Sequence, residues 1–506
     1  MDLVSLKSFF PEIFLTISAM AFLIFNTMFI NTSVFNFPVL NRELFSQVFY
    51  ILLCAFILNL NTDIESYSIN FLFCNDLGSN SVKTLVFLTS LFALIPIYTS
   101  FRLQKLNFFE FFFFYLISIV SLLLLISVSD MLSAFLTIEL QSFCFYILAC
   151  FRRDSSFSTE AGLKYFILGS FFSGLFLMGC SLIYSICGTL NFLSLNILLT
   201  ECLLSTIGYE SHFILLLGSF FIIVSLLFKV AAFPFHFWAP DVYDGSPLAS
   251  TIVFAVLPKF SIFYFFLKFM SLIDLFSEIK IILLISGVLS VAVSSFFALI
   301  QKKFKKLIIY SSLAQIGFII GAISINHIDS FIAVFFFLIV YIMTSILVWA
   351  NMSILHSFYS KLNNFEGRAH NTLYISALSS FFAFNKAWSF VNIIYFFSLA
   401  GIPPFIGFLS KFVIVVSLIN KIDFFIPLVF LLVSAIGVFY YIRVLKIIFF
   451  EKSNNIKINL IVFNDNYSSL ENLIVSIFLF LILYFSFFPS FILNISSFIY
   501  FNSFFS

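Results

Sequence analysis

Four ionisable residues lie in the interior of apolar runs, where charged side chains are rare. They are Glu139, Lys229, Lys259 and Lys411. Such a charge near the centre of a bilayer costs about 2.5–3.5 kcal/mol on insertion scales. A desolvated lysine releases its proton more readily than a hydrated one, whereas arginine keeps its proton. A glutamate and three lysines in series therefore predict a proton relay.

Helix-breaking prolines accompany two of these lysines. Lys229 is followed by Pro234, and Lys411 is preceded by the sequence GIPP at 401–404. Proline removes a helical hydrogen bond, and such breaks persist at membrane depth only where other groups satisfy the backbone. His236 follows the first break, and it either passes protons or caps the broken helix.

A single intramembrane lysine can also form a structural ion pair or extend to the membrane surface. Four such groups near span centres make that interpretation weak for the whole set. The sequence therefore favours an ion path over simple packing.

The composition is that of a polytopic membrane protein. Of 506 residues, 62% are hydrophobic and only 9% are charged, and the apolar runs are of span length. The net charge of +2 with scattered basic residues gives no indication of nucleic-acid binding. The seven cysteines contain no C-x-x-C motif, so no zinc site or iron–sulfur cluster is indicated. No metal or redox cofactor is expected in this chain.

The apolar runs predict an all-α fold of about 14 transmembrane helices. The expected spans are 10–30, 45–61, 83–100, 107–128, 131–150, 163–187, 212–238, 247–271, 280–300, 306–325, 330–356, 388–418, 423–450 and 470–497. The run at 190–207 is weaker and is expected at the membrane interface.

Spans seven and twelve both combine a lysine with a proline break. They are five spans apart, so they run in opposite directions, as in transporters built from inverted repeats. The first repeat would contain spans four to eight and the second spans nine to thirteen. The expected division is 1–106, 107–271, 272–450 and 451–506.

Loop charges alternate along these spans, as the positive-inside rule predicts. Loops after odd-numbered spans carry Arg42, Arg102, Lys105, Arg152, Arg153, Lys302, Lys303, Lys305, Lys306, Lys361, Arg368 and Lys452. Loops after even-numbered spans carry Asp63, Glu65, Asp76, Glu201, Glu210, Asp274, Glu278 and Asp329. Asp241 and Asp244, after span seven, are the exception. Both termini are therefore expected on the acidic side, away from the matrix or cytoplasm.

Six segments of the sequence carry specific motifs, at 139–149, 158–166, 233–247, 307–317, 398–412 and 437–446. These motifs resemble the subunit 2 family of the proton-pumping NADH:ubiquinone oxidoreductase, respiratory complex I, in its mitochondrial type. Together they cover about 130–330 and 397–450, while the first hundred and last fifty residues match only in general character.

The resemblance implies an antiporter-like, fourteen-helix subunit. It implies that Glu139 and Lys229 form a coupled pair, that Lys259 is the central lysine, and that Lys411 lies on the exit side. Gln315 departs from this pattern, because many relatives carry histidine there. A water molecule or Tyr310 would have to bridge this point.

The resemblance also implies the surroundings of the chain. Expected partners are other membrane-arm subunits of complex I, including further antiporter-like ones, and membrane lipids. Flavin and iron–sulfur clusters would belong to partner subunits, and NADH and ubiquinone would be substrates of the whole complex. The expected location is the mitochondrial inner membrane, with both termini on the intermembrane-space side. The 82 phenylalanines suggest an organelle-encoded gene.

Two other functions remain open. A subunit of a cation/proton antiporter would share every charged residue named above. A structural membrane-arm subunit without its own proton path would tolerate replacement of Lys229 and Lys411 by methionine.

Overall fold

The computed structural model describes most of the chain. The described residues are 7–32, 41–62, 66–68, 72–104, 108–204, 209–274, 276–363, 374–379, 382, 386–421, 424–451 and 469–504. Among the loop charges, Asp63, Glu65, Lys105, Arg368 and Lys452 lie outside these residues, as do the side chains of Arg102, Glu201, Glu210 and Lys361.

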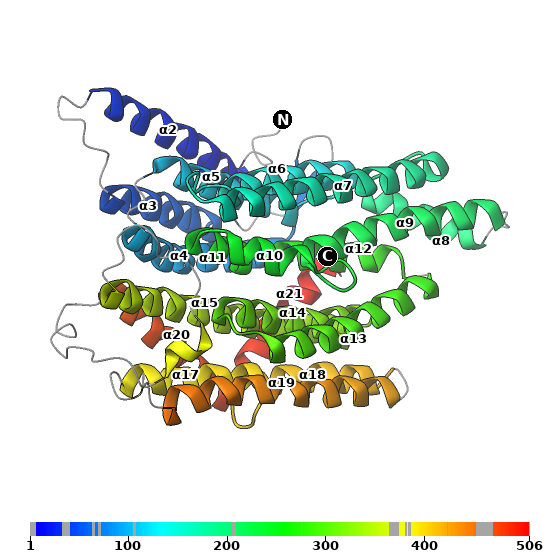
Figure 1. Ribbon diagram of the computed structural model, residues 1–506. Coiled ribbons are helices and arrows are strands. Elements are labelled where there is room, and N and C mark those ends of the chain that lie inside the picture. Colours follow the sequence, from blue (N-terminus) through cyan, green and yellow to red (C-terminus); the bar gives the residue numbers. More distant parts are fainter. Residues whose placement is uncertain are drawn as a thin grey trace.

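Long helices lie side by side and build nearly the whole molecule (Figure 1). In the described part of the chain, 13 of them are long and apolar enough to cross a membrane. The broken pair α17 (Lys386–Ala400) and α18 (Ile406–Ile419) supplies one further span. The predicted all-α polytopic fold is confirmed. Helices are favoured here because lipid offers no partners to backbone N–H and C=O groups.

The N-terminal part contains three spans and a small hairpin. Its elements are α2 (Phe10–Thr32), α3 (Asn41–Leu60), β1 (Ser66–Ser68), β2 (Phe73–Asn75) and α4 (Leu77–Gln104). The two strands pair antiparallel, with Tyr67 opposite Cys74. This hairpin was not predicted.

The next five spans, four to eight, contain the first break. They comprise α5 (Phe109–Ile126), α6 (Met131–Ala149), α7 (Ser156–Cys187), α8 (Phe192–Leu204), α9 (Tyr209–Val230), α10 (Trp238–Gly245), α11 (Leu248–Val256) and α12 (Pro258–Leu272). The short α8 corresponds to the weaker apolar run, and α10 lies within the connection after α9.

The remaining spans follow in the same manner, with the second break between α17 and α18. They comprise α13 (Ser277–Ile300), α14 (Phe304–Ile323), α15 (Ile328–Asn363), the 3₁₀ turn η1 (Ile375–Leu378), α17, α18, α19 (Phe425–Phe450), α20 (Ser469–Phe487) and α21 (Ser490–Phe504).

The two sets of five spans pack in matching ways. In the first set, α5 packs on α6, α7 on α9, and α12 on α5. In the second set, α13 packs on α14, α15 on α18, and α19 on α13. Corresponding helices therefore make corresponding contacts, as expected of the predicted inverted repeats.

Three helix boundaries differ from the sequence prediction. Span seven ends at Val230, before its proline. Span eight divides at Leu257, so that Pro258 occupies the first position of α12, which needs no backbone N–H. The last span divides near Pro489 into α20 and α21. In each case proline ends or starts a helix where the apolar run continues.

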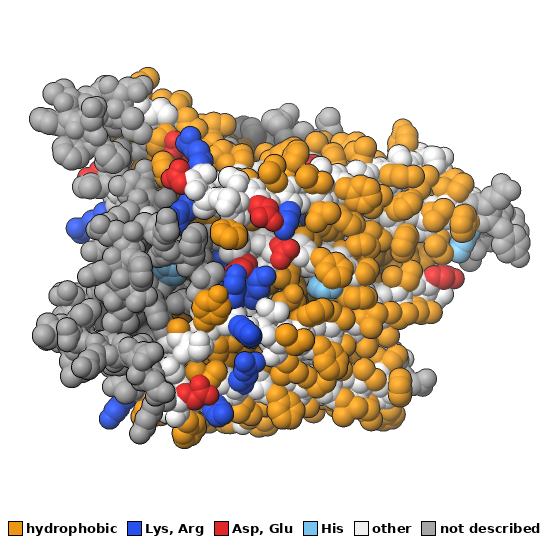
Figure 2. All heavy atoms as spheres, viewed as in Figure 1, with side chains coloured by type: hydrophobic (Ala, Val, Ile, Leu, Met, Phe, Trp, Pro, Cys, Tyr) orange, Lys and Arg blue, Asp and Glu red, His pale blue; other side chains and the backbone are white. Residues whose placement is uncertain are grey.

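The visible face of the molecule is largely apolar. Figure 2 shows a broad area of hydrophobic side chains, with Lys, Arg, Asp and Glu gathered toward one end. Large side chains such as Phe439 and Leu432 are 69% and 62% exposed. Such a surface fits a chain surrounded by lipid and other membrane helices rather than by water.

Candidate functional site: a lysine cavity between broken helices

Glu139 and Lys229 lie near each other without forming a close ion pair. Glu139 is half-buried on α6, where its Oε2 accepts a 3.3 Å hydrogen bond from Ser142 Oγ. Lys229 lies in the last turn of α9 and interacts electrostatically with Glu139. Among the described residues, Lys229 Nζ and Glu139 Oε1 are buried without a hydrogen-bond partner. The two groups are thus coupled through space, and both are free to bind water.

Contacts of nearby aromatic residues stabilise the break after Lys229. Ala231 adopts a left-handed conformation with φ 66°. Trp238 Nε1 donates a 2.9 Å hydrogen bond back to the carbonyl oxygen of Phe228. The same indole stacks on Tyr165, with ring centroids 4.6 Å apart. The hydrogen bond from Trp238 satisfies the Phe228 carbonyl near the end of α9, as a broken membrane helix requires.

Lys259 faces the same cavity as Lys229. This cavity has a volume of about 20 Å³, and its polar lining comprises Gln141, Tyr165, Lys229, Trp238, Tyr243 and Lys259. Its size admits about one water molecule. Pro258 begins α12 immediately before Lys259, so the break in span eight sets this lysine at a helix start. The structure therefore brings together two of the predicted relay lysines, and Glu139 interacts electrostatically with one of them, Lys229.

Lys411 is held separately, at the second break. Its Nζ donates hydrogen bonds of 2.9 Å to the carbonyl oxygens of Leu399 and Ala400, at the end of α17. It also lies 5.6 Å from the ring centre of Phe318. A cation at a helix C-terminus is favoured by the helix dipole. Lys411 is thus anchored, whereas Lys229 is not.

Gln315 shares a partner with Lys411. Its Nε2 donates a 3.0 Å hydrogen bond to Leu399 O, the same oxygen that accepts from Lys411. Gln315 also lines a second cavity of about 10 Å³ together with Tyr341, Thr344 and Ser410. Neither Lys259 nor Lys411 lines that cavity. Tyr310 instead stacks on Phe297, with centroids 5.7 Å apart.

His236 lies beside the first break, away from the lysine cavity. The residue is only 4% exposed and is packed near the rings of Phe233 and Phe237, at 5.5 and 4.3 Å. It is not among the residues that line the cavity of Lys229 and Lys259. The structure does not bring it together with the lysines.

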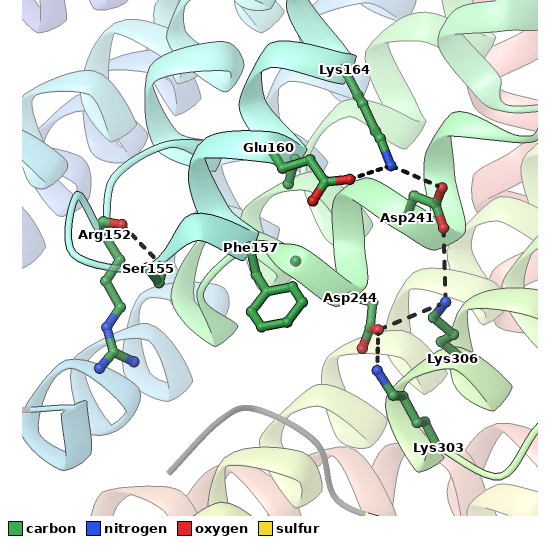
Figure 3. A pocket seen from close by; sticks show the side chains of 11 residues that line it. Arg152, Ser155, Phe157, Glu160, Lys164, Asp241, Asp244, Lys303 and Lys306 are labelled. Atoms are coloured by element: carbon green, nitrogen blue, oxygen red, sulfur yellow. Dashed lines mark hydrogen bonds and ion pairs between the residues drawn. The ribbon is translucent and has the colours of Figure 1, made fainter. Parts of the chain in front are cut away.

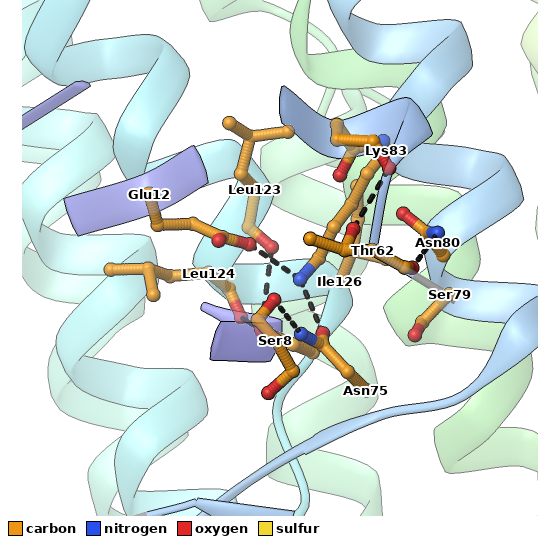
Figure 4. Close-up of polar contacts among 12 residues, drawn as sticks. Ser8, Glu12, Thr62, Asn75, Ser79, Asn80, Lys83, Leu123, Leu124 and Ile126 are labelled. Atoms are coloured by element: carbon orange, nitrogen blue, oxygen red, sulfur yellow. Dashed lines mark hydrogen bonds and ion pairs between the residues drawn. The ribbon is translucent and has the colours of Figure 1, made fainter. Parts of the chain in front are cut away.

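A buried ion pair in the N-terminal helices escaped the sequence analysis. Lys83 Nζ on α4 lies 2.5 Å from Glu12 Oε1 on α2, and both side chains are almost fully buried. Lys83 also donates to Asn75 Oδ1, and Asn75 Nδ2 donates to Ser8 O at 2.7 Å (Figure 4). Glu12 and Lys83 lie near span ends, where charges usually reach water, and 71 residues separate them. No local pattern connects them.

Lys305 is a second buried cation that was assigned to a loop. It is 1% exposed, and its Nζ donates a 2.9 Å hydrogen bond to Ser246 O. It belongs to the run KKFKK at 302–306, which resembles a solvated basic loop. The signal available was Phe304, an apolar residue at the point where α14 begins.

Comparisons with known proteins agree with this architecture. A family model described as "NADH:quinone oxidoreductase/Mrp antiporter, TM" matches residues 128–437. The NADH-ubiquinone oxidoreductase chain 2 of Marchantia polymorpha is 33% identical over 455 residues, covering 87% of this chain and 88% of that protein. The NADH-quinone oxidoreductase subunit N of Pelagibacter ubique is 32% identical, covering 74% and 76%.

Solved structures share the fold at lower identity. A chain of respiratory complex I from Thermus thermophilus has a TM-score of 0.76 and 22% identity, with 96% of this chain and 99% of that chain covered. A chain of the Mrp complex from Dietzia sp. DQ12-45-1b has a TM-score of 0.80 and 15% identity, with 99% and 98% covered.

Proposed function

Because the chain belongs to the NADH:quinone oxidoreductase/Mrp antiporter family, we propose that it moves protons through Glu139, Lys229, Lys259 and Lys411. The chain is an antiporter-like membrane-arm subunit of NADH:ubiquinone oxidoreductase, complex I. The redox reaction belongs to the whole enzyme. In the described part of this chain, no group of three or more His, Cys, Asp or Glu side chains could hold a metal ion.

The shared cavity of Lys229 and Lys259 is the observation that carries the proposal. Glu139 stabilises the ammonium form of Lys229 while it stays near. When Glu139 turns away, the desolvated ammonium of Lys229 becomes a stronger acid. It then gives its proton, through a water in the cavity, to the uncharged amine of Lys259. Lys229 is left as a neutral amine, ready to be protonated again.

The onward step leads toward Lys411. Lys259 would pass the proton across the region of Gln315, whose side chain shares Leu399 O with Lys411. An amide cannot carry a net proton at neutral pH, so water must complete this step. Quinone reduction elsewhere in the complex would start the cycle by an electrostatic change that reaches Glu139. His236 is assigned a secondary role at the edge of this path.

The setting follows from the same proposal. The neighbours would be other membrane-arm subunits, including antiporter-like ones, together with lipids, and the membrane would be the mitochondrial inner membrane. The chain would divide into the N-terminal helices at 1–106, the first repeat at 107–271, the second repeat at 272–450, and the C-terminal loop and helix at 451–506. Both termini would face the intermembrane space.

Replacing Lys229 by alanine tests the relay. Lys229→Ala should lower proton pumping and the NADH oxidation coupled to it by roughly tenfold or more, since each proton step is essential in a series. Assembly should persist, because removal of an unpartnered buried charge does not destabilise the fold. The measurement is proton uptake per NADH in proteoliposomes that contain the intact complex.

Lys446→Ala provides the matched control. Lys446 lies on α19 and its side chain is 67% exposed. That variant should pump normally. Normal coupled pumping in Lys229→Ala would refute the relay and would favour a structural subunit without its own proton path.

A further inference from the structure

A two-turn helix separates the lysine cavity from the surface. The inner side of α10 supplies Trp238 and Tyr243 to the lining of that cavity. Tyr243 also donates a 3.2 Å hydrogen bond to Phe254 O, which holds α10 against α11. Asp241 and Asp244 lie on the other side of the same helix and line a surface pocket. One short element therefore has a relay cavity on one side and a polar pocket on the other.

The pocket is large, polar and open. Its volume is about 270 Å³, and its lining includes Arg152, Glu160, Lys164, Lys303 and Lys306 (Figure 3). The lining of the whole pocket comes from the connections after spans five, seven and nine and from the N-terminal turns of α7 and α14. All three connections follow odd-numbered spans, which the alternation of loop charges places on the basic side of the membrane, although Asp241 and Asp244 are themselves acidic. This is the side from which a pump takes up protons.

Ion pairs tie α10 to the helices that surround the pocket. Asp244 Oδ2 lies 2.8 Å from Lys303 Nζ, and the Asp244 side chain is 12% exposed. Lys306 Nζ lies 3.8 Å from carboxylate oxygens of both Asp241 and Asp244. Lys164 on α7 lies 3.6 Å from Asp241 (Figure 3). Lysines of the second repeat thus hold a helix of the first.

The chain segments at both ends of α10 permit movement of this helix. Non-helical residues 231–237 precede it, and Ser246 and Pro247 follow it. Lys305 binds Ser246 O at the C-terminal end and would act as a pivot. Partly exposed ion pairs are individually weak, so a small electrostatic change can release them. Trp238, Val242 and Tyr243 are buried on the inner side of α10, so the ion pairs restrain its outer side.

We propose that this pocket is the water entrance of the relay and that α10 is its gate, held closed by Lys303 and Lys306. The proposal rests on the relay function above. Release of Asp244 lets α10 swing outward, so that water of the pocket joins the cavity. A hydronium ion then protonates the neutral amine that Lys229 holds after its transfer to Lys259, and leaves as water. When α10 returns to its closed position, it separates the protonated lysine from the water on the basic side of the membrane.

Hydrogen–deuterium exchange of the intact complex tests the gate directly. In Asp244→Asn and in Lys303→Gln, amides of residues 238–246 should exchange roughly two- to fivefold faster, because Lys303→Gln removes one weak ion pair that restrains local opening and Asp244→Asn removes two. The idle complex should also dissipate an imposed pH gradient faster in either single variant.

The matched control is Asp274→Asn. It removes the 2.5 Å pair between Asp274 and Lys280 at another surface of the protein. Exchange of residues 238–246 should not change in that variant. Should Asp244→Asn fail to assemble, Lys303→Gln breaks the same pair from the α14 side.

Unchanged exchange of residues 238–246 in an assembled single variant would overturn the gate. A refutation of the relay proposal would give a different pattern of results. Normal pumping in Lys229→Ala would refute the relay, whereas faster exchange of α10 in Asp244→Asn would persist. The two proposals can therefore fail separately.

Discussion

Lys229 and Lys411 are held differently, although both are assigned to one proton path. Lys229 Nζ has no hydrogen-bond partner in the described part of the protein, whereas Lys411 Nζ is bound to two carbonyl oxygens. An unpartnered ammonium responds strongly to the position of Glu139. A bound one is less sensitive to distant charge. The two lysines thus suit a responsive start and a stable end of the path.

Buried lysines with and without a carboxylate partner should behave in opposite ways. Lys83→Met should lower the stability of the fold by about 3–5 kcal/mol, because Glu12 would be left as an uncompensated buried charge. Lys259→Met should leave stability nearly unchanged or raise it, since no carboxylate pairs with Lys259 among the described residues. Lys259→Met should nevertheless abolish pumping.

Thermal unfolding of the detergent-solubilised complex, paired with proton uptake in proteoliposomes, measures both effects. Equal loss of stability in the two variants would show that the environment of Lys259 contains a charge partner.

The two broken helices share one electrostatic arrangement. Lys229 lies in the last turn of α9, and Lys411 reaches back from α18 to the end of α17. The Lys229 residue therefore lies at the C-terminal end of one half-helix, and the Lys411 ammonium group lies at the C-terminal end of another, where carbonyl dipoles favour positive charge. In sequence Lys229 precedes its break, whereas Lys411 follows its break. In space both lysines lie next to the C-terminal end of a half-helix.

Gly401 allows the second break to accommodate Lys411. Its φ is +77°, and a Cβ there would lie 2.9 Å from Lys411 Cδ. Gly401→Ala should cost about 1–2 kcal/mol of backbone strain and should also displace Lys411, so pumping should fall severalfold. Coupled turnover and thermal stability are the two measurements.

Gly188→Ala separates the two effects. Gly188 ends α7 with φ +69°, but open space surrounds its Cβ position. This variant should lose similar stability and keep full pumping. If both variants pump equally well, the contact between Gly401 and Lys411 has no role in the path.

At the scale of the whole molecule, the proposed relay involves both sets of five spans. Glu139, Lys229 and Lys259 belong to the first set of five spans, and Lys411 belongs to the second. Groups that act in series form one functional unit, and losses from such groups are not additive. The double variant Lys229→Ala with Lys411→Ala should therefore pump no worse than the more impaired single variant. A further loss in the double variant, measured as protons per NADH, would indicate two parallel paths.

Sequence reasoning identified the spans, both breaks and the two lysines of the cavity, because each rests on local pattern. Burial cost alone singles out Glu139, Lys229 and Lys259. The buried pair of Lys83 and Glu12 was missed, since its members meet only through tertiary packing. The ion pair between Lys303 and Asp244 of α10 was missed for the same reason, because the two residues are 59 positions apart in sequence. Helix ends at Pro258 and Pro489 were missed because hydropathy continues across them.

The pair of Glu12 and Lys83 also constrains how the chain enters the bilayer. If α2 or α4 were inserted alone, its charge near the span end would lack a partner, at a cost below the roughly 2.5–3.5 kcal/mol of a charge at the bilayer centre. Because α3 connects the two helices, the cost is avoided when all three leave the insertion machinery together. The first hundred residues are thus expected to be released into lipid as one preassembled unit during synthesis, before the pumping repeats emerge from the ribosome.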